Sequence, residues 1–289
     1  MAAPDADLEL DAELVHRLLL EQHPDLAHLP IAEVASGWDN VVFRLGSDLA
    51  VRMPRREVGA WLITSEQRWL AELAPTLPLP VPAPVRVGGP GLGYPWPWSI
   101  VPWFQGEEAT CGEPRDWDQT ARRLAAFLVA LHRPAPADAP MSPYRGVPLA
   151  VRAPILTDGL NQLGGSVDRA RIDAVWERLV ATPAWPGPPV WIHGDLHPRN
   201  LVLDRGELAA VIDFGDMTAG DPAVDLSVAW FWLPAAVRPT FCEALGGVDD
   251  DTWARAKGWA LALSIGHLCG DERVIQLGRR ALAAVLDDG

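Results

Sequence analysis

Apolar side chains recur at helical spacing in several stretches of the chain. Between residues 117 and 131, the side chains of Leu124, Phe127, Leu128 and Leu131 follow the i, i+3, i+4, i+7 pattern of one helix face. The same periodicity predicts helices over residues 7–21 and 61–73. Beyond residue 117 the pattern is mainly helical.

Short apolar runs of strand length occupy the first third of the chain. They cover residues 31–34, 41–45, 49–53 and 99–104 and are separated by turn-forming residues. Together with the helix over 61–73 they predict an α+β chain, with a small lobe of antiparallel sheet plus helix before a larger, mainly helical lobe. At 289 residues the chain exceeds the usual size of a single core, so we expect two lobes, 1–104 and 105–289.

Candidate chemistry is concentrated after residue 192. In His193-Gly-Asp-Leu-His-Pro-Arg-Asn200, a carboxylate precedes an amide by five positions, and Asp213 follows at the end of an apolar strand. Phosphoryl transfer needs a carboxylate that takes the proton of the attacking hydroxyl, and oxygen ligands that hold Mg²⁺ on the nucleotide phosphates. We therefore expect Asp195 to be the catalytic base, with Asn200 and Asp213 as magnesium ligands. Residues 201–203 and 208–212 predict a β-hairpin between them.

These segments resemble the aminoglycoside phosphotransferase family, a group of protein-kinase-like small-molecule kinases that includes macrolide kinases. The resemblance rests on the block 193–200, on Ile212-Asp-Phe-Gly215 and on Gly220-Asp-Pro-Ala-Val-Asp-Leu226, with weaker similarity upstream. It implies a two-lobed protein-kinase-like fold that binds a nucleotide between its lobes, and the same roles for Asp195, Asn200 and Asp213. Asp221 and Asp225 are expected to be structural.

Arginine replaces the lysine that such kinases carry on the third strand. The matching strand presents Arg52, and the only lysine in the chain is Lys257. A guanidinium contacts phosphate oxygens in two places and stays charged at any working pH, so we expect Arg52 to bind the nucleotide phosphates. Glu66, on the helix over 61–73, is its expected partner. Glu57 is the competing candidate.

Two further segments are expected to contact the nucleotide. The turn 35–40 lies between two strands and holds one glycine, so we predict a phosphate-covering loop that uses the backbone N–H groups of Ser36, Gly37 and Asn40. An ordinary hairpin turn is the alternative reading. The main chain of 101–104 is the expected hinge that binds the base. Its cofactor-binding residues are Val101, Trp103 and Phe104.

The acceptor site is less determined by the sequence. Asp216 and His197 lie beside the catalytic motifs, and Trp230 and Trp232 follow them on a stretch that could supply aromatic walls. Core packing is the alternative for each tryptophan. The net charge of −14 suits a cationic acceptor, but we favour a structural role for the acidic residues near the C-terminus, with Asp249 to Asp251 as caps before a helix over 253–268 and the others at solvated helix ends.

Composition excludes several classes of protein. The negative net charge argues against a nucleic-acid partner, and no apolar stretch is long enough to predict a membrane span. Three scattered cysteines and a start without a secretory signal favour a reducing cytoplasm. The His-x3-His spacing at 193–197 could bind zinc only on a helix, which Gly194 and Pro198 disfavour. We expect a monomer or weak dimer.

The predicted function is an ATP- or GTP-dependent, Mg²⁺-dependent O-phosphotransferase acting on a hydroxyl of a small molecule. The resemblance implies an antibiotic as the acceptor, either an aminoglycoside or a macrolide, and a role in antibiotic resistance. A metabolic kinase for an amino alcohol, a sugar or homoserine would use the same catalytic residues. A catalytically silent nucleotide-binding protein is the third alternative.

Overall fold

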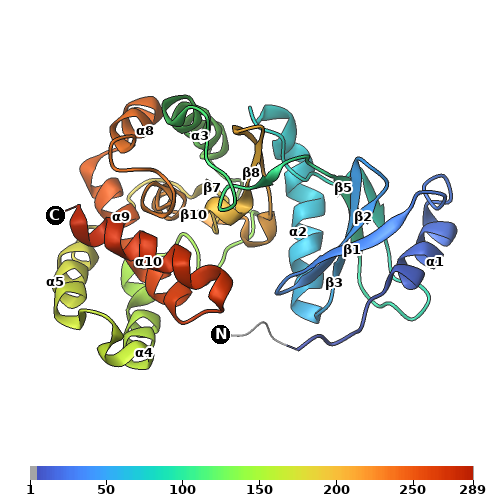
Figure 1. The fold of residues 1–289 in the computed structure, drawn as a ribbon, viewed down its shortest axis with the longest axis horizontal. Coiled ribbons are helices and arrows are strands. Elements are labelled where there is room, and N and C mark those ends of the chain that lie inside the picture. The colour runs from blue at the N-terminus through green and yellow to red at the C-terminus, as the bar shows by residue number, and fades with distance from the viewer. Residues whose placement is uncertain (1–4, 289) are drawn as a thin grey trace. The chain divides into compact units, whose positions relative to one another are not determined.

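The computed structural model describes residues 5–288, which divide into two compact units (Figure 1). The N-terminal unit comprises residues 5–106 and 210–215, and the C-terminal unit comprises residues 107–209 and 216–288. The first contains an antiparallel sheet with helices, and the second is mainly helical. The α+β fold class expected from the sequence is therefore confirmed.

The N-terminal unit is built on one five-stranded antiparallel sheet of order β1-β2-β3-β5-β4. Its core lies between the sheet and the first helix, where Val15, Leu18 and Leu19 pack against residues such as Phe43 and Trp98. Its elements are α1 (Ala12–Gln22), β1 (Ile31–Ser36), β2 (Asn40–Leu45), β3 (Leu49–Pro54), α2 (Glu57–Leu73), η1 (Ala74–Thr76), β4 (Arg86–Gly88) and β5 (Trp98–Pro102).

The first helix starts later than its periodicity predicts, and the second starts earlier. Asp11 caps α1, since its side chain accepts a hydrogen bond of 2.8 Å from the Leu14 amide. Asp7, which the periodicity placed in the first helix, instead accepts a hydrogen bond of 2.9 Å from the Glu57 amide at the start of α2. Capping chemistry thus decides both boundaries.

The C-terminal unit packs its helices around α9, which is buried on most of its circumference by α4, α5, α6, α7 and α10. The hairpin of β8 and β9 predicted from the sequence is present in the three-stranded sheet β6-β8-β9. The elements from residue 107 onward are β6 (Glu107–Glu108), α3 (Trp117–Leu131), η2 (Leu149–Arg152), α4 (Ala153–Leu163), η3 (Gly164–Ser166), α5 (Arg169–Val180), β7 (Val190–Ile192), η4 (Pro198–Asn200), β8 (Leu201–Asp204), β9 (Glu207–Val211), η5 (Phe214–Asp216), β10 (Thr218–Gly220), α6 (Ala223–Leu226), α7 (Val228–Phe231), α8 (Arg238–Leu245), α9 (Asp250–Leu268) and α10 (Glu272–Asp287).

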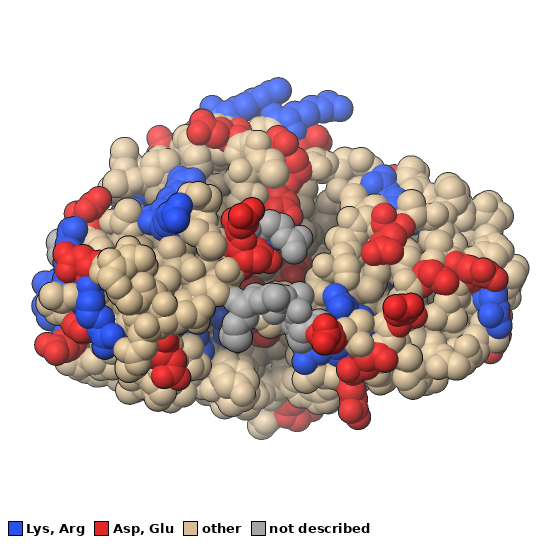
Figure 2. Space-filling model, turned by 60° about the horizontal axis from the view of Figure 1, so that its bottom comes forward, with Lys and Arg blue, Asp and Glu red and all other residues tan. Residues whose placement is uncertain are grey.

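Acidic residues near the C-terminus serve the fold. Asp249 caps α9 by accepting a hydrogen bond of 2.6 Å from the Thr252 amide, and Asp288 forms ion pairs with Arg238 and Lys257. On the face shown in Figure 2, Asp and Glu side chains are interspersed with Lys and Arg. The capping interpretation of Asp249 is therefore confirmed. No helix within residues 5–288 combines the length and apolar composition needed to cross a membrane.

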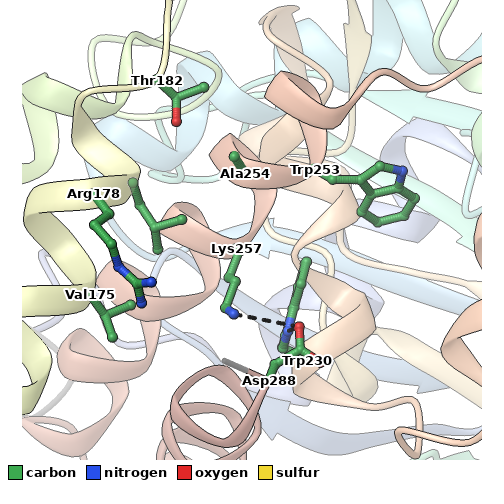
Figure 3. Close-up of a pocket in the computed structure, with 9 residues that line it drawn as sticks. Val175, Arg178, Thr182, Trp230, Trp253, Ala254, Lys257 and Asp288 are labelled. Carbon is green, nitrogen blue, oxygen red and sulfur yellow. Dashed lines mark hydrogen bonds and ion pairs between the residues drawn. The ribbon is translucent and has the colours of Figure 1, made fainter.

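A cavity of about 390 Å³ lies in the C-terminal unit (Figure 3). Its walls come from α5, α7 and α9 together with the end of the chain. Aromatic, apolar and charged side chains line it: Val175, Arg178, Leu179, Thr182, Trp230, Trp253, Ala254, Lys257 and Asp288.

A buried ion pair ties the segment before α6 to the central helix. Arg255 on α9 donates to Asp221 at 2.7 Å, with side chains only 2% and 4% exposed. The remaining groups of the pair are also satisfied, because Arg255 donates to the Thr252 hydroxyl and Asp221 accepts from the Ala223 amide. The structural role expected for Asp221 agrees with these contacts.

Removing one partner of this pair should be strongly destabilising. We expect Asp221→Ala to lower the free energy of unfolding by about 3–5 kcal/mol, because a buried guanidinium loses its counter-ion. Urea denaturation followed by circular dichroism measures the change. The matched control is Asp204→Ala, whose ion pair with Arg205 is 4.0 Å long and exposed and should contribute less than about 1 kcal/mol. Equal stability of the two variants would contradict the assignment.

Candidate active site

The loop predicted to be catalytic follows β7 and is held by one buried carboxylate. The two oxygens of Asp225 accept hydrogen bonds of 2.8 Å each from the His193 and Gly194 amides. His132 lies 3.0 Å from the same carboxylate, which is completely buried. Asp225 therefore fixes the backbone on the N-terminal side of Asp195, as its expected structural role requires.

Inside the loop, side chains and backbone fix one another. Gly194 has φ +84°, and a Cβ there would lie 2.5 Å from the Asp216 carbonyl oxygen, so only glycine fits. The His193 Nδ1 accepts a hydrogen bond from the Asp195 amide at 3.2 Å. The Asn200 side-chain amide donates to the Asp195 carbonyl at 2.9 Å, which leaves its Oδ1 available as a ligand.

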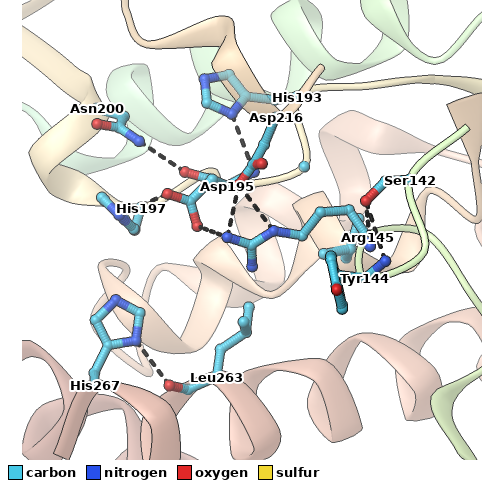
Figure 4. Close-up of polar contacts among 12 residues, drawn as sticks. Ser142, Tyr144, Arg145, His193, Asp195, His197, Asn200, Asp216, Leu263 and His267 are labelled. Atoms are coloured by element: carbon cyan, nitrogen blue, oxygen red, sulfur yellow. Dashed lines mark hydrogen bonds and ion pairs between the residues drawn. The ribbon is translucent and has the colours of Figure 1, made fainter. Parts of the chain in front are cut away.

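An arginine that the sequence analysis did not single out holds two of the predicted site residues (Figure 4). The Nη2 of Arg145 lies 2.8 Å from Asp195 and 2.7 Å from Asp216, and its Nε donates to Asp216 at 3.0 Å. The structure therefore brings Asp195 and Asp216 together around one guanidinium. Asp216 therefore lies in the same charged cluster as Asp195, the predicted catalytic base.

The loop that carries Arg145 is anchored on both sides. The Ser142 hydroxyl accepts hydrogen bonds of 3.1 Å from the Tyr144 and Arg145 amides, and the Ser142 amide donates to the Thr218 hydroxyl at 2.8 Å. Beyond the arginine, the Gly146 carbonyl accepts from the Asp221 amide at 2.9 Å. The guanidinium is thus presented by a segment fixed to β10 and its exit.

The electrostatics of the cluster keep Asp195 ionised. Burial raises the pKa of this carboxyl, but the Arg145 guanidinium and His197 outweigh it and hold the pKa well below its usual range. His197 lies 3.4 Å from Asp195 and stacks edge to face on His267. Burial lowers the pKa of His267 to about 4, and its Nδ1 donates to the Leu263 carbonyl at 2.7 Å.

The two tryptophans expected to contact the acceptor lie in different surroundings. Trp232 is 1% exposed and packs edge to face on Trp117, and Trp230 lines the cavity with Lys257. Between them, Phe231 packs against His267, with ring centroids 5.2 Å apart. The acceptor-binding role of Trp230 and Trp232 stays a prediction.

In the N-terminal unit, Arg52 on β3 forms a buried ion pair with Glu66 on α2. Arg52 also lies 3.4 Å from Asp213. Burial lowers the pKa of the Arg52 guanidinium, but the Glu66 and Asp213 carboxylates more than offset this, so the pKa lies above its ordinary value. The pair with Glu66, preferred from the sequence over Glu57, is present.

Asp213 itself has an unusual backbone. Its φ of 62° lies in the left-handed region, which aspartate tolerates better than most residues. Its side chain is 59% exposed although it faces a buried guanidinium. A carboxylate with one oxygen near a fixed guanidinium and most of its surface exposed suits a cation that keeps several waters.

The turn expected over the phosphates is braced by two arginines. The Arg55 guanidinium donates to the Ser36 hydroxyl at 3.0 Å and to the Gly37 carbonyl at 3.2 Å. Arg56 pairs with Asp39 at 3.2 Å. The Gly37 amide donates to the Asn40 carbonyl at 2.8 Å, so this N–H is used within the turn itself. The amides of the turn are therefore not all free for a ligand.

The expected hinge is partly occupied as well. The Trp103 amide donates to the Asp48 carbonyl at 2.8 Å, and the Trp103 ring lies under the Arg44 guanidinium. Val101 pairs with Ala50 in the sheet and is buried, and β5 ends at Pro102. Phe104 lies just beyond, so the main chain after Trp103 is the part of this segment left for a base.

The donor set fits Mg²⁺ better than zinc. Asn200 offers a neutral amide oxygen and Asp213 an anionic one, both of the hard type that Mg²⁺ prefers. Asn200 belongs to the C-terminal unit and Asp213 to the N-terminal unit. Among residues 5–288, no cluster of three or more His, Cys, Asp or Glu side chains is arranged to hold a metal. His193 and His197 lie on a loop, not on a helix.

The sheet unit with its Arg–Glu pair and the helical unit with its Asp195 loop define a kinase-like phosphotransferase fold. A family model described as the phosphotransferase enzyme family matches residues 30–259. The chain therefore belongs to the phosphotransferase enzyme family, and the prediction that it is an enzyme of the phosphotransferase class is confirmed.

Solved structures agree on the fold. The GDP complex of aminoglycoside 2'-phosphotransferase-IIIa is 20% identical with a TM-score of 0.73, over 96% of this chain and 99% of that one. Macrolide 2'-phosphotransferase MphH from Brachybacterium faecium is 22% identical with a TM-score of 0.62, over 94% of this chain and 97% of that one.

A relative found by sequence matches only part of the chain. Uncharacterized protein YcbJ of Bacillus subtilis (strain 168) is 32% identical over 114 residues, which cover 37% of this chain and only 36% of that protein.

The contact between Arg145 and Asp195 should determine how kcat/KM depends on pH. Because the pKa of Asp195 is held below its usual range, Asp195 stays ionised as the pH falls through mild acidity, and kcat/KM should show no acid limb from this group there. In Arg145→Met the main lowering influence is gone while burial remains, so the limb should move to higher pH. The pH profile of nucleoside diphosphate release measures it.

Arg145→Lys is the control, since it retains a positive charge beside Asp195 and should keep the acid limb near its wild-type position. Superimposable profiles for wild type and Arg145→Met would show that the guanidinium does not set the ionisation of the base.

Proposed function

We propose that this chain is a nucleoside triphosphate-dependent O-phosphotransferase whose acceptor is a hydroxyl of a small molecule. The observation that carries the proposal is the Asp195 loop: a fixed, ionised carboxylate, with the Asn200 amide oxygen left free on the other side of the same loop. Phosphoryl transfer depends on positioning and charge more than on covalent chemistry. The rigid loop supplies both.

In the proposed reaction, the acceptor hydroxyl donates its proton to Asp195. Its oxygen forms the new bond to the γ-phosphorus while the bond to the bridging oxygen of the diphosphate breaks. Asp195 orients the hydroxyl by accepting its hydrogen bond in the ground state. Because Arg145 weakens Asp195 as a base, orientation is its larger contribution, and proton transfer follows as the new bond forms.

Arg52, with Glu66 behind it, would hold the nucleotide phosphates. Asn200 and Asp213 would hold Mg²⁺, which when bound neutralises charge on the phosphates. A guanidinium already buried against two carboxylates keeps its orientation without a ligand, so its free donors are pre-organised for phosphate oxygens. Both adenine and guanine donors are compatible with this scheme. Of the similar proteins, one was solved as a GDP complex and another as a streptomycin–ATP ternary complex.

Two classes of acceptor are considered for this reaction, antibiotics and small metabolites. Antibiotics are supported by the similar aminoglycoside and macrolide phosphotransferases. The metabolic alternative is favoured by one observation, because the cluster that would receive the reacting hydroxyl contains the Arg145 guanidinium. An acceptor with an ammonium group beside that hydroxyl would face a like charge there.

Two substitutions separate the roles of the carboxylates. We expect Asp195→Ala to lower kcat by at least about 10²-fold with nucleotide affinity largely kept, because only the acceptor hydroxyl loses its partner. Asp213→Ala should instead abolish magnesium-dependent nucleotide binding. Steady-state diphosphate release and calorimetric titration of the nucleotide with and without Mg²⁺ measure the two effects.

Asp204→Ala, on the exposed end of β8, serves as the control and should leave both quantities unchanged. Turnover by Asp195→Ala equal to that of the wild type would remove the proposed base. Nucleotide binding by Asp213→Ala that still requires Mg²⁺ would remove the proposed ligand.

A further inference from the structure

Arg152, at the end of η2, is a buried cation with unused donors. The residue is 8% exposed, and its Nη1 donates a long hydrogen bond of 3.5 Å to the Tyr144 carbonyl. Its Nε is buried without a hydrogen-bond partner, and the contacts of the described residues give Nη2 none either. The Nε–Nη2 edge of the guanidinium, an edge that can bind a carboxylate in two parallel hydrogen bonds, therefore has no acceptor among the described residues.

Other buried arginines of the chain hold carboxylates. Arg52 holds Glu66 and Arg255 holds Asp221, whereas no ion pair of Arg152 occurs among residues 5–288. Burial lowers the pKa of Arg152, and the positive charge of Arg145 lowers it further. A buried charge without a counter-ion is unfavourable, so this position calls for an anion from outside the chain.

A second unpartnered donor lies against the first. The Arg152 guanidinium lies 5.5 Å from the centroid of the Trp259 ring. The indole Nε1 of Trp259, on α9, is likewise buried without a hydrogen-bond partner. Stacking on the ring stabilises the cation but accepts none of these N–H groups. The Nε–Nη2 edge of Arg152 and the indole Nε1 of Trp259 both lack an oxygen acceptor among the described residues.

These donors lie in line with the catalytic cluster along α9. Trp259, Leu263 and His267 occupy positions i, i+4 and i+8 and so share one face of the helix. His267 stacks on His197, which contacts Asp195, and eight residues of helix rise about 12 Å. Arg152 is also linked to Arg145 through the backbone. The Tyr144 carbonyl that accepts the hydrogen bond from Arg152 belongs to the peptide that joins Tyr144 to Arg145.

We propose that the acceptor of this enzyme carries a carboxylate, bound by the Nε–Nη2 edge of Arg152 with Trp259 Nε1 beside it, several bonds from the hydroxyl that Asp195 receives. This inference rests on the proposed function and names its acceptor class as a hydroxy carboxylate. The Arg145 guanidinium fits the same class, because it disfavours an ammonium near the reacting hydroxyl and has its Nη1 free of any partner among the described residues.

The test uses ω-hydroxy carboxylates of four to ten carbons, each matched with its primary amide and with the amino alcohol of equal length. Binding to the full chain is measured by thermal shift, and turnover by nucleoside diphosphate release. We expect at least one hydroxy carboxylate to raise the melting temperature and to be phosphorylated, with kcat/KM at least about tenfold above its amide and amino alcohol, because only the carboxylate completes a charge-assisted pair.

Substitutions of Arg152 and Trp259 test where the carboxylate of the acceptor binds. Arg152→Met should raise the KM for the hydroxy carboxylate by at least about tenfold while the KM for the nucleotide stays unchanged, and Arg152→Lys should recover part of the loss. Trp259→Phe removes the indole N–H together with part of a fully buried ring, so circular dichroism first establishes that the variant is folded; the folded variant should bind the carboxylate more weakly. Amide binding should be indifferent to all three.

Three results would overturn the inference: an amide or amino alcohol used as well as its carboxylate, unchanged carboxylate KM in Arg152→Met, or no hydroxy carboxylate bound by a wild type that binds the nucleotide. The last result leaves the proposed function standing, since nucleotide binding is measured separately. A wild type that binds no nucleoside triphosphate with Mg²⁺ would instead mean that the proposed function is wrong.

Discussion

The carboxylate of Asp225 is the constraint on which the Asp195 loop, the predicted catalytic loop, depends. Its two oxygens accept hydrogen bonds from the consecutive amides of His193 and Gly194, so both N–H groups converge on one carboxylate. Directly after this pair, Gly194 redirects the chain with a positive φ that favours glycine. Asp195 therefore emerges from the loop in a direction set by a buried charge, not by its own side-chain preferences.

Arginine organises the carboxylates within each unit. Arg52 gathers Glu66 and Asp213 in the sheet unit, and Arg145 gathers Asp195 and Asp216 in the helical unit. In both cases a planar fork with several donors bridges two anions, which the compact ammonium of a lysine would do with less geometric control. Both clusters are thus built on guanidinium groups in a chain with a single lysine, and Arg152 is a further buried guanidinium, without a carboxylate partner among the described residues.

Local motifs made half of the site predictable. Asp195, Asn200 and Asp213 could be selected because their residue types and spacing follow from the chemistry of phosphoryl transfer, and Glu66 because the family resemblance favours it over Glu57. Arg145 could not be selected, because it lies fifty positions before Asp195 in an irregular loop, where nothing distinguishes one arginine from the others. The roles of Trp230 and Trp232 could not be decided from the sequence, because the one-turn helix α7 is too short for periodicity to show which side chains are buried. The fold followed from periodicity, while capping by Asp7 and Asp11 moved the helix boundaries.

The most direct measurement is native-state hydrogen exchange of the His193 and Gly194 amides in wild type and Asp225→Asn. Asparagine offers one acceptor oxygen where aspartate offers two, so one amide loses a charge-assisted bond of about 1.5–3 kcal/mol. We predict exchange at least about tenfold faster at this pair, with the Trp191 amide of β7 unchanged. Equal protection of the pair in both proteins would contradict the claim that Asp225 fixes the loop.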